Sequence, residues 1–240
     1  MKKFASFFAV FLFITLFAVA SEAGDRNIPV EVAQLTDSLK KQFAPDRRVA
    51  LLDVDYSFSD KNVMLRGVTT SAEAKNALLK ELARKGYTVM DCLELLPDVK
   101  GLEGKTCGII NVSVANMRVA PDFSSEMMTQ SLMGMPVRVL QRDGWVRIQT
   151  PDNYIAWVHR VGVHPVTEEE MAAWNKAEKI VVTAHYGFVY SEPNQTSQTV
   201  SDVVAGNRLK WEGSKGAFYK VTYPDGRRGY ISKSIAMPEK

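Results

Sequence analysis

The stretch of sequence that decides the fold lies at residues 112–121 and reads VSVANMRVAP. Its last six residues, NMRVAP, have a counterpart 72 positions later, FVYSEP at residues 188–193. Three further blocks recur in the same order: VRV at 137–139 with LKW at 209–211, GWVRI at 144–148 with AFYKV at 217–221, and AWV at 156–158 with GYI at 229–231. Matched blocks in one order, separated by turns, indicate an internal duplication.

Each copy of the repeat spans about 60 residues and has room for short strands only. Short strands at this spacing favour a small closed barrel, because an open sheet of that size would leave its edges exposed. We therefore expect SH3-like barrels of about five strands at residues 105–166 and 178–237. Thr167 and Glu170 form a capping box that predicts a helical linker at residues 167–177, packed rather than flexible because it carries apolar side chains.

The sequence of residues 27–98 predicts a different fold, a small α+β unit. Apolar residues at helical spacing predict a helix at 27–43, and alternating residues predict a hairpin at 50–68. Thr70 with Glu73 predicts the start of a second helix, Gly86 its end, and a strand follows to residue 96. The chain is thus predicted to be mainly β, with an α-β-β-α-β unit before two tandem barrels.

The first 23 residues have the features of a secretory signal peptide. Lys2 and Lys3 precede an apolar run at 7–20, which is short for a membrane span, and small residues that suit cleavage follow. An uncleaved anchor is the alternative. We expect export to the periplasm or cell envelope, with no membrane span after cleavage.

The charge of the chain excludes one class of partner. Without Lys2, Lys3 and Glu22, the 30 basic and 27 acidic residues become 28 and 26, a net charge near +2. The two signs are interspersed along the sequence. We therefore expect no nucleic-acid partner.

The repeated blocks resemble a bacterial SH3 domain. In that family N-x-R-x-x-P marks the first variable loop, G-W-x-x-V the central strand and G-Y-x-x-W-V the last hairpin. The first copy shows them as NMRVAP at 116–121, GWVRI at 144–148 and YIAWV at 154–158, with Gly134 and VRVL at 137–140 between. The second copy departs from the pattern, with FVY at 188–190 and Phe218 in place of the tryptophan.

The order of parts carries two further resemblances. Residues 27–98, with LRGV at 65–68 before a helix and YTV at 87–89 after it, resemble the BON fold of envelope proteins. The whole chain is similar to the N-terminal region of secreted NlpC/P60 cell-wall cysteine peptidases of the Bacteroidetes. That resemblance implies peptidoglycan stem peptides as partners, and a following catalytic domain that cleaves between D-glutamate and a diamino acid.

The catalytic motif of that family, Asp-Cys-Ser-Gly, is not found in this sequence. Asp91 and Cys92 are followed by Leu93 and Glu94, and they fall on a predicted strand. A cysteine nucleophile also needs an imidazole within reach. We predict no catalytic residues, no cofactor and no enzyme on this chain, which ends at Lys240 where the peptidase domain would begin. It is either a truncated relative or a free-standing adaptor.

Aromatic and loop residues are the candidates for a binding surface. Aromatic rings pack on sugar faces and peptide stems, and loops often carry binding residues. The candidates on this basis are Arg118, Asp122, Tyr154, Trp157 and Tyr190, with Arg118, Asp122 and Tyr154 on predicted loops. Core packing is the alternative for Trp145, Trp157, Phe218 and Tyr230, and we favour it for Trp145 and Phe218.

Cysteines and metal-ligating residues are few. Cys92 and Cys107 could form a disulfide across the boundary between the α+β unit and the first barrel, or remain unpaired as small buried groups. Asp53 with Asp55 and His159 with His164 lack the further ligands of a metal site. No metal site is predicted.

Three functions are consistent with these features. The leading hypothesis is a non-catalytic module that binds or targets peptidoglycan through its tandem SH3 domains. The second is the substrate-positioning part of an NlpC/P60 peptidase whose catalytic domain is absent from this chain. The third is an envelope scaffold that holds a protein partner.

Overall fold

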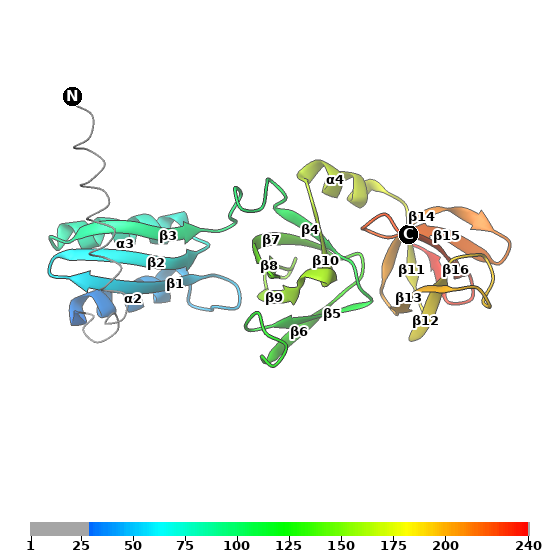
Figure 1. Ribbon diagram of the computed structural model, residues 1–240, viewed down its shortest axis with the longest axis horizontal. Helices are drawn as coiled ribbons and strands as arrows, with labels where there is room; N and C mark the ends of the chain where they lie inside the picture. The colour runs from blue at the N-terminus through cyan, green and yellow to red at the C-terminus, as the bar shows by residue number, and fades with distance from the viewer. Residues whose placement is uncertain (1–28, 240) are drawn as a thin grey trace, which may run out of the picture. The chain divides into compact units, whose positions relative to one another are not determined.

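The computed structural model describes residues 29–239, so the predicted signal peptide lies outside the described residues. The chain divides into two compact units, Met1–Leu96 and Pro97–Lys240. Among the helices of the described part, none is both long and apolar enough to cross a membrane. The two units are described in turn (Figure 1).

The first unit has the predicted α-β-β-α-β order. It comprises α2 (Val30–Phe43), β1 (Leu52–Ser59), β2 (Asn62–Thr69), α3 (Ala72–Arg84) and β3 (Thr88–Leu95). The sheet order is β1-β2-β3, with β1 and β2 antiparallel and β2 and β3 parallel through the α3 crossover. Its core joins both helices to the sheet around the fully buried Val32, Leu65 and Leu78.

The start of α3 differs from the sequence prediction. Ser71, not Thr70, caps the helix, because the Ser71 side chain accepts a hydrogen bond from the backbone of Ala74 at 3.0 Å. The Thr70 hydroxyl instead accepts a bond from the backbone of Leu51 at 3.0 Å. The helix end is as predicted, with Gly86 at a φ of +81° that side chains other than glycine's rarely adopt.

The second unit begins with a seven-stranded barrel, drawn in greens in Figure 1. Its elements are β4 (Cys107–Ile110), β5 (Val114–Arg118), β6 (Met127–Leu132), β7 (Pro136–Asp143), β8 (Trp145–Gln149), β9 (Ile155–His159), η2 (Arg160–Gly162) and β10 (Val163–Val166). They pair in the order β10-β4-β7-β8-β9-β5-β6.

The second barrel repeats the first. Its strands are β11 (Lys179–Val182), β12 (Tyr186–Tyr190), β13 (Thr199–Val204), β14 (Arg208–Lys215), β15 (Phe218–Thr222), β16 (Arg228–Ser232) and β17 (Ala236–Pro238). They pair in the equivalent order β17-β11-β14-β15-β16-β12-β13. Each barrel has seven strands rather than the expected five, because short strands of three to four residues close one edge.

Strand register confirms the duplication at the level of single residues. In the first barrel Arg118 pairs with Trp157, and in the second Tyr190 pairs with Tyr230. The β7–β8 ladder shifts register after Val139, and the β14–β15 ladder shifts after Trp211, which is the matching position. The two copies therefore share their bulges as well as their topology.

Helix α4 (Glu168–Lys176) joins the barrels and is packed, as its apolar residues predict. Thr167 and Glu170 form the predicted capping box. Met171 and Trp174 are buried against Ile109 and Val166 of the first barrel.

The two barrels of the second unit also contact each other directly. Met133 of the first barrel is buried within the core of the second, and its carbonyl accepts a hydrogen bond from the backbone of Arg208 at 2.9 Å. The fully buried Asn207 donates its side-chain amide to the carbonyl of Ser113 at 2.8 Å. Ser113 in turn donates to Asp202 at 2.6 Å. We call these contacts the seam.

The disulfide considered from the sequence stays a prediction, because its two cysteines belong to different units. Cys92 is exposed on β3. Cys107 lies on β4, where its side chain is half-buried in the wall of a pocket of its own barrel. Cys92 does not fit the alternative of two buried thiols, and Cys107 fits it only in part.

A glycine pair tests the seam. Gly134 and Gly144 both have left-handed backbones, with φ of +86° and +67°, so alanine costs about 1–2 kcal/mol at either site. A Cβ on Gly134 would also lie 2.4 Å from the carbonyl oxygen of Arg208, whereas one on Gly144 meets nothing within 4 Å. We expect Gly134→Ala to destabilise the second unit by about 2 kcal/mol more than Gly144→Ala.

Urea unfolding followed by tryptophan fluorescence measures this difference, because all four tryptophans lie after residue 144, within the second unit. Equal losses in the two variants would show that the seam adds nothing to stability.

Candidate functional site

Strands β8 and β9 determine which side chains of the first barrel face outward. Val146 and Ile148 are buried in the barrel core, at 1% and 0% exposure. Because side chains alternate along a strand, their neighbours Trp145 and Arg147 point to the outer surface. The sequence-based placement of Trp145 in the core is therefore wrong, and the same alternation takes Phe218 out of the core of the second barrel.

Trp157 lies on the outer side of this sheet, between two arginines, and is itself only 8% exposed. Arg147 pairs with Trp157 across β8 and β9, and its guanidinium lies 4.7 Å from the centroid of the indole ring. Arg118 pairs with Trp157 from the other side, across β5 and β9, and donates to the carbonyl of Ser125 at 2.6 Å. The cation stacked on the ring and the second arginine beside it place two positive charges here, and the Asp122 carboxylate interacts electrostatically with Arg118.

An aromatic cluster adjoins the arginines. Trp145 pairs with His159 in the sheet, and their ring centroids are 5.3 Å apart. Phe123, from the β5–β6 loop, lies 4.9 Å from Trp145 and 5.1 Å from His159. Phe123 is 67% exposed, so the cluster presents an apolar edge to solvent. We refer to Arg118, Phe123, Trp145, Arg147, Trp157 and His159 together as the Arg–Trp face.

The β5–β6 loop is held by its own polar side chains. Asp122 accepts hydrogen bonds from the backbone and the hydroxyl of Ser124, at 2.8 and 3.0 Å. These bonds, the backbone one first, lower the pKa of the Asp122 carboxyl below its usual value. Ser125 accepts a bond from the backbone of Ala120 at 2.9 Å. The loop thus presents Phe123 on a braced backbone.

The structure brings together some of the predicted residues and separates others. Arg118 and Trp157 are neighbours on the Arg–Trp face, although Arg118 ends strand β5 rather than lying in a loop. Asp122 lies in the adjoining loop, where its carboxylate braces the backbone. Tyr154 lies in the β8–β9 loop, tied through its backbone to Thr150.

Four members of the face were not among the predicted site residues: Phe123, Trp145, Arg147 and His159. Arg147 could have been found from the alternation of GWVRI, in which it stands between two apolar residues. Phe123 carries a weaker signal, as a large apolar residue two positions after the proline of a variable loop. His159 was considered from the sequence as a metal ligand, but it packs against two aromatic rings.

The second barrel carries a different surface at the same place. Tyr190 occupies the position of Arg118, and Tyr230, paired with Lys220, that of Trp157. Along β12, Tyr186 and Phe188 continue the row, with ring centroids 5.1 Å apart, and Phe188 lies 6.4 Å from Tyr190. The same frame therefore displays a row of tyrosine and phenylalanine side chains that includes the place of Arg118, and it keeps a cation, Lys220, at the place of Arg147.

Cys107 does not have the electrostatic environment of a nucleophilic thiol. Burial, and next the charge of Glu168, raise the pKa of the Cys107 thiol, which keeps it protonated at neutral pH. A cysteine nucleophile needs the opposite shift. Within residues 29–239, no group of three or more His, Cys, Asp or Glu side chains is arranged to hold a metal ion.

Comparison with known families matches both barrels. Residues 117–161 match the model of the bacterial dipeptidyl-peptidase Sh3 domain, and residues 185–235 match that of the bacterial SH3 domain. The chain therefore carries two bacterial SH3 domains. No curated protein matches the sequence.

Solved structures of NlpC/P60 proteins align with part of this chain. An NlpC/P60 family protein from Bacillus cereus ATCC 10987 aligns at 19% identity with a TM-score of 0.47, over 56% of each chain. An NlpC/P60 endopeptidase from Photobacterium damselae subsp. piscicida aligns at 15% identity with a TM-score of 0.43, over 59% of this chain. This chain spans 56% of the first structure and 35% of the second.

Removal of Phe123 tests the aromatic cluster. Because its ring is 67% exposed, we expect Phe123→Ala to change the free energy of unfolding by less than about 1 kcal/mol. The loss of its contact should make Trp145 more accessible, which acrylamide quenching of tryptophan fluorescence detects.

Trp145→Phe in the same background provides the control. It should abolish the extra quenching, and Val119→Ala, an exposed residue at the base of the same loop, should cause none. Unchanged quenching in Phe123→Ala would contradict the cluster.

Proposed function

We propose that this chain is a non-catalytic module that binds peptidoglycan, and that the Arg–Trp face of the first SH3 domain makes the contact. One observation carries the proposal: two arginines of one sheet lie beside an exposed aromatic edge formed with Phe123 of the adjoining loop. Trp and Arg are enriched among the residues that dominate binding energies.

The chemistry of the face suits a peptide stem attached to a sugar. Stem peptides carry carboxylates, which guanidinium groups recognise through paired, charge-assisted hydrogen bonds. The rings of Phe123 and Trp145 offer apolar surface with little entropy to lose, since their contacts already order them. Arg118 and Arg147 would receive carboxylates, and the aromatic edge would receive apolar groups or sugar faces.

The first barrel is the better candidate of the two. The second barrel replaces Arg118 by Tyr190 and offers no aromatic cluster equivalent to Phe123, whose position in the repeat is taken by Gln195. Its surface is less suited to an anionic peptide. We assign wall binding to the first barrel and a separate role to the second.

The proposed site of action is the cell envelope. The features of residues 1–23 support export, and the family matches to bacterial SH3 domains fit a cell-wall-associated module. The similarity of residues 27–98 to the BON fold stays a proposal, which the observed element order supports. That unit would serve attachment within the envelope.

A second candidate function rests on the family match of the first barrel. The matching model is named for a bacterial dipeptidyl-peptidase, so the barrel would help to position the substrate of a peptidase domain. An in-frame Asp-Cys-Ser-Gly motif encoded after Lys240 would support this candidate, and a stop codon there would oppose it.

Retention on purified peptidoglycan tests the leading proposal. We expect the folded protein to sediment with insoluble peptidoglycan at low and at moderate salt. The double variant Phe123→Ala/Arg147→Gln should lower retention about tenfold, because it removes one aromatic contact and one cation.

Lys220→Gln is the matched control, since Lys220 has the place of Arg147 in the second barrel. It should leave retention unchanged. Retention no greater than that of the denatured protein, or an equal loss in both variants, would refute the assignment to the Arg–Trp face.

A further inference from the structure

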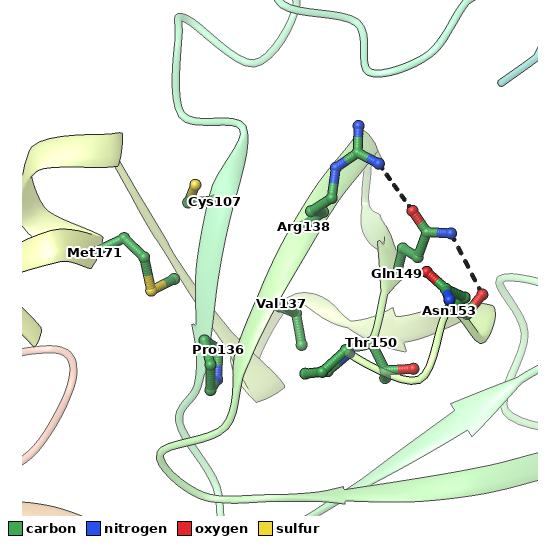
Figure 2. A pocket seen from close by; sticks show the side chains of 9 residues that line it. Cys107, Pro136, Val137, Arg138, Gln149, Thr150, Asn153 and Met171 are labelled. Carbon is green, nitrogen blue, oxygen red and sulfur yellow. Dashed lines mark hydrogen bonds between the residues drawn. The ribbon is translucent and has the colours of Figure 1, made fainter. Parts of the chain in front are cut away.

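A pocket of about 330 Å³ lies beside the first barrel, next to helix α4. Figure 2 shows an apolar wall formed by Cys107, Pro136 and Met171, and a polar wall formed by Arg138 and Gln149. Its volume is at the lower end of the range for small-molecule sites. The pocket therefore suits one or two amino-acid residues rather than a long chain.

Strand register builds the pocket. Cys107 pairs with Arg138 across β4 and β7, and Arg138 pairs with Gln149 across β7 and β8. Paired residues point to the same face of a sheet, so these side chains gather on the outside of the barrel. Met171, from α4, adds its thioether to the apolar side.

The polar wall offers a cation without an anionic partner. Arg138 donates one hydrogen bond to the side-chain oxygen of Gln149, at 3.0 Å. Of the carboxylates in residues 29–239, none lies within ion-pair distance of Arg138. A guanidinium has five donors, so most of those on Arg138 remain for a ligand.

The side chains that line the opposite wall, Cys107, Pro136 and Met171, are uncharged, and the charge that acts on Cys107 besides that of Arg138 is that of Glu168. Burial raises the pKa of Cys107, so its thiol is neutral at physiological pH. A ligand that satisfies both walls has a small apolar group beside a carboxylate. The carboxyl-terminal residue of a short peptide has this combination, and the side-chain amide of Asn153 at the pocket wall can pair with the preceding peptide bond.

We infer that the pocket binds the carboxyl-terminal residue of a short peptide, with the carboxylate on Arg138 and the side chain against Met171 and Pro136. The inference rests on the proposed function, since stem peptides supply such ends, but it concerns a site apart from the Arg–Trp face. The pocket would bind the carboxyl-terminal end of a stem peptide while the Arg–Trp face binds another part of the peptidoglycan.

Cys107 provides a direct reporter of occupancy. In a Cys92→Ser background it is the only thiol, because the chain has two cysteines. Its alkylation by N-ethylmaleimide at mildly alkaline pH should slow when the probe acetyl-D-alanyl-D-alanine fills the pocket. At ten times the Kd of the probe, mass action predicts a slowing of about tenfold.

Two comparisons isolate the carboxylate. The same probe with a carboxyl-terminal amide should protect Cys107 at least fivefold less. Arg138→Gln should abolish protection by the acid, while Arg142→Gln, an exposed residue on the same strand outside the pocket, should preserve it. Equal protection by acid and amide, or no protection by either, would overturn the inference.

Peptidoglycan retention of the same proteins separates the two proposals. Retention that depends on Phe123 and Arg147, without protection of Cys107, would refute peptide binding in the pocket and support the proposed function. Protection of Cys107 without retention would support the pocket and refute peptidoglycan binding by the Arg–Trp face.

Discussion

The antiparallel register of β8 and β9 is the constraint on which the first barrel depends. It places Val146 and Ile148 in the core, and by the same alternation it places Arg147 beside Trp157 on the surface. A slip of one residue would exchange the two faces of the strand. The same register therefore determines both which side chains form the core and which lie on the proposed binding face.

The duplicated barrel shows how a frame persists while its surface changes. The bulges, the strand order and the paired positions are common to both copies, because they determine whether the barrel closes. Outward-facing side chains do not affect closure of the barrel. At one such position the first barrel has Arg118 and the second has Tyr190. Substitution of Asn207 or Met133 would lower the stability of the second unit, because each of these side chains is buried against the other barrel at the seam. Tandem barrels joined in this way can present two different surfaces.

Much of the fold could be predicted from the sequence, because the repeat preserves strand spacing and the capping box of Thr167 and Glu170 is local. Prediction was wrong where a residue had two available partners. Thr70 bonds to Leu51, a contact distant in sequence, so Ser71 caps α3. The outward position of Trp145 follows from alternation, but its bulk favoured the core. Phe123 and the Arg138 pocket depend on loop bracing and on the placement of α4, which no local pattern encodes.

The four indole N–H groups allow peptidoglycan binding by the first barrel to be tested in one spectrum. The indole of Trp174 donates to the carbonyl of Gly134, and that of Trp211 donates to the carbonyl of Gly213, which makes both internal references. On titration with a soluble muramyl peptide, nuclear magnetic resonance should show the Trp145 and Trp157 indole signals shifting in a saturable way while those references stay in place. Shifts confined to Trp211, or no saturable shift at all, would contradict binding by the first barrel.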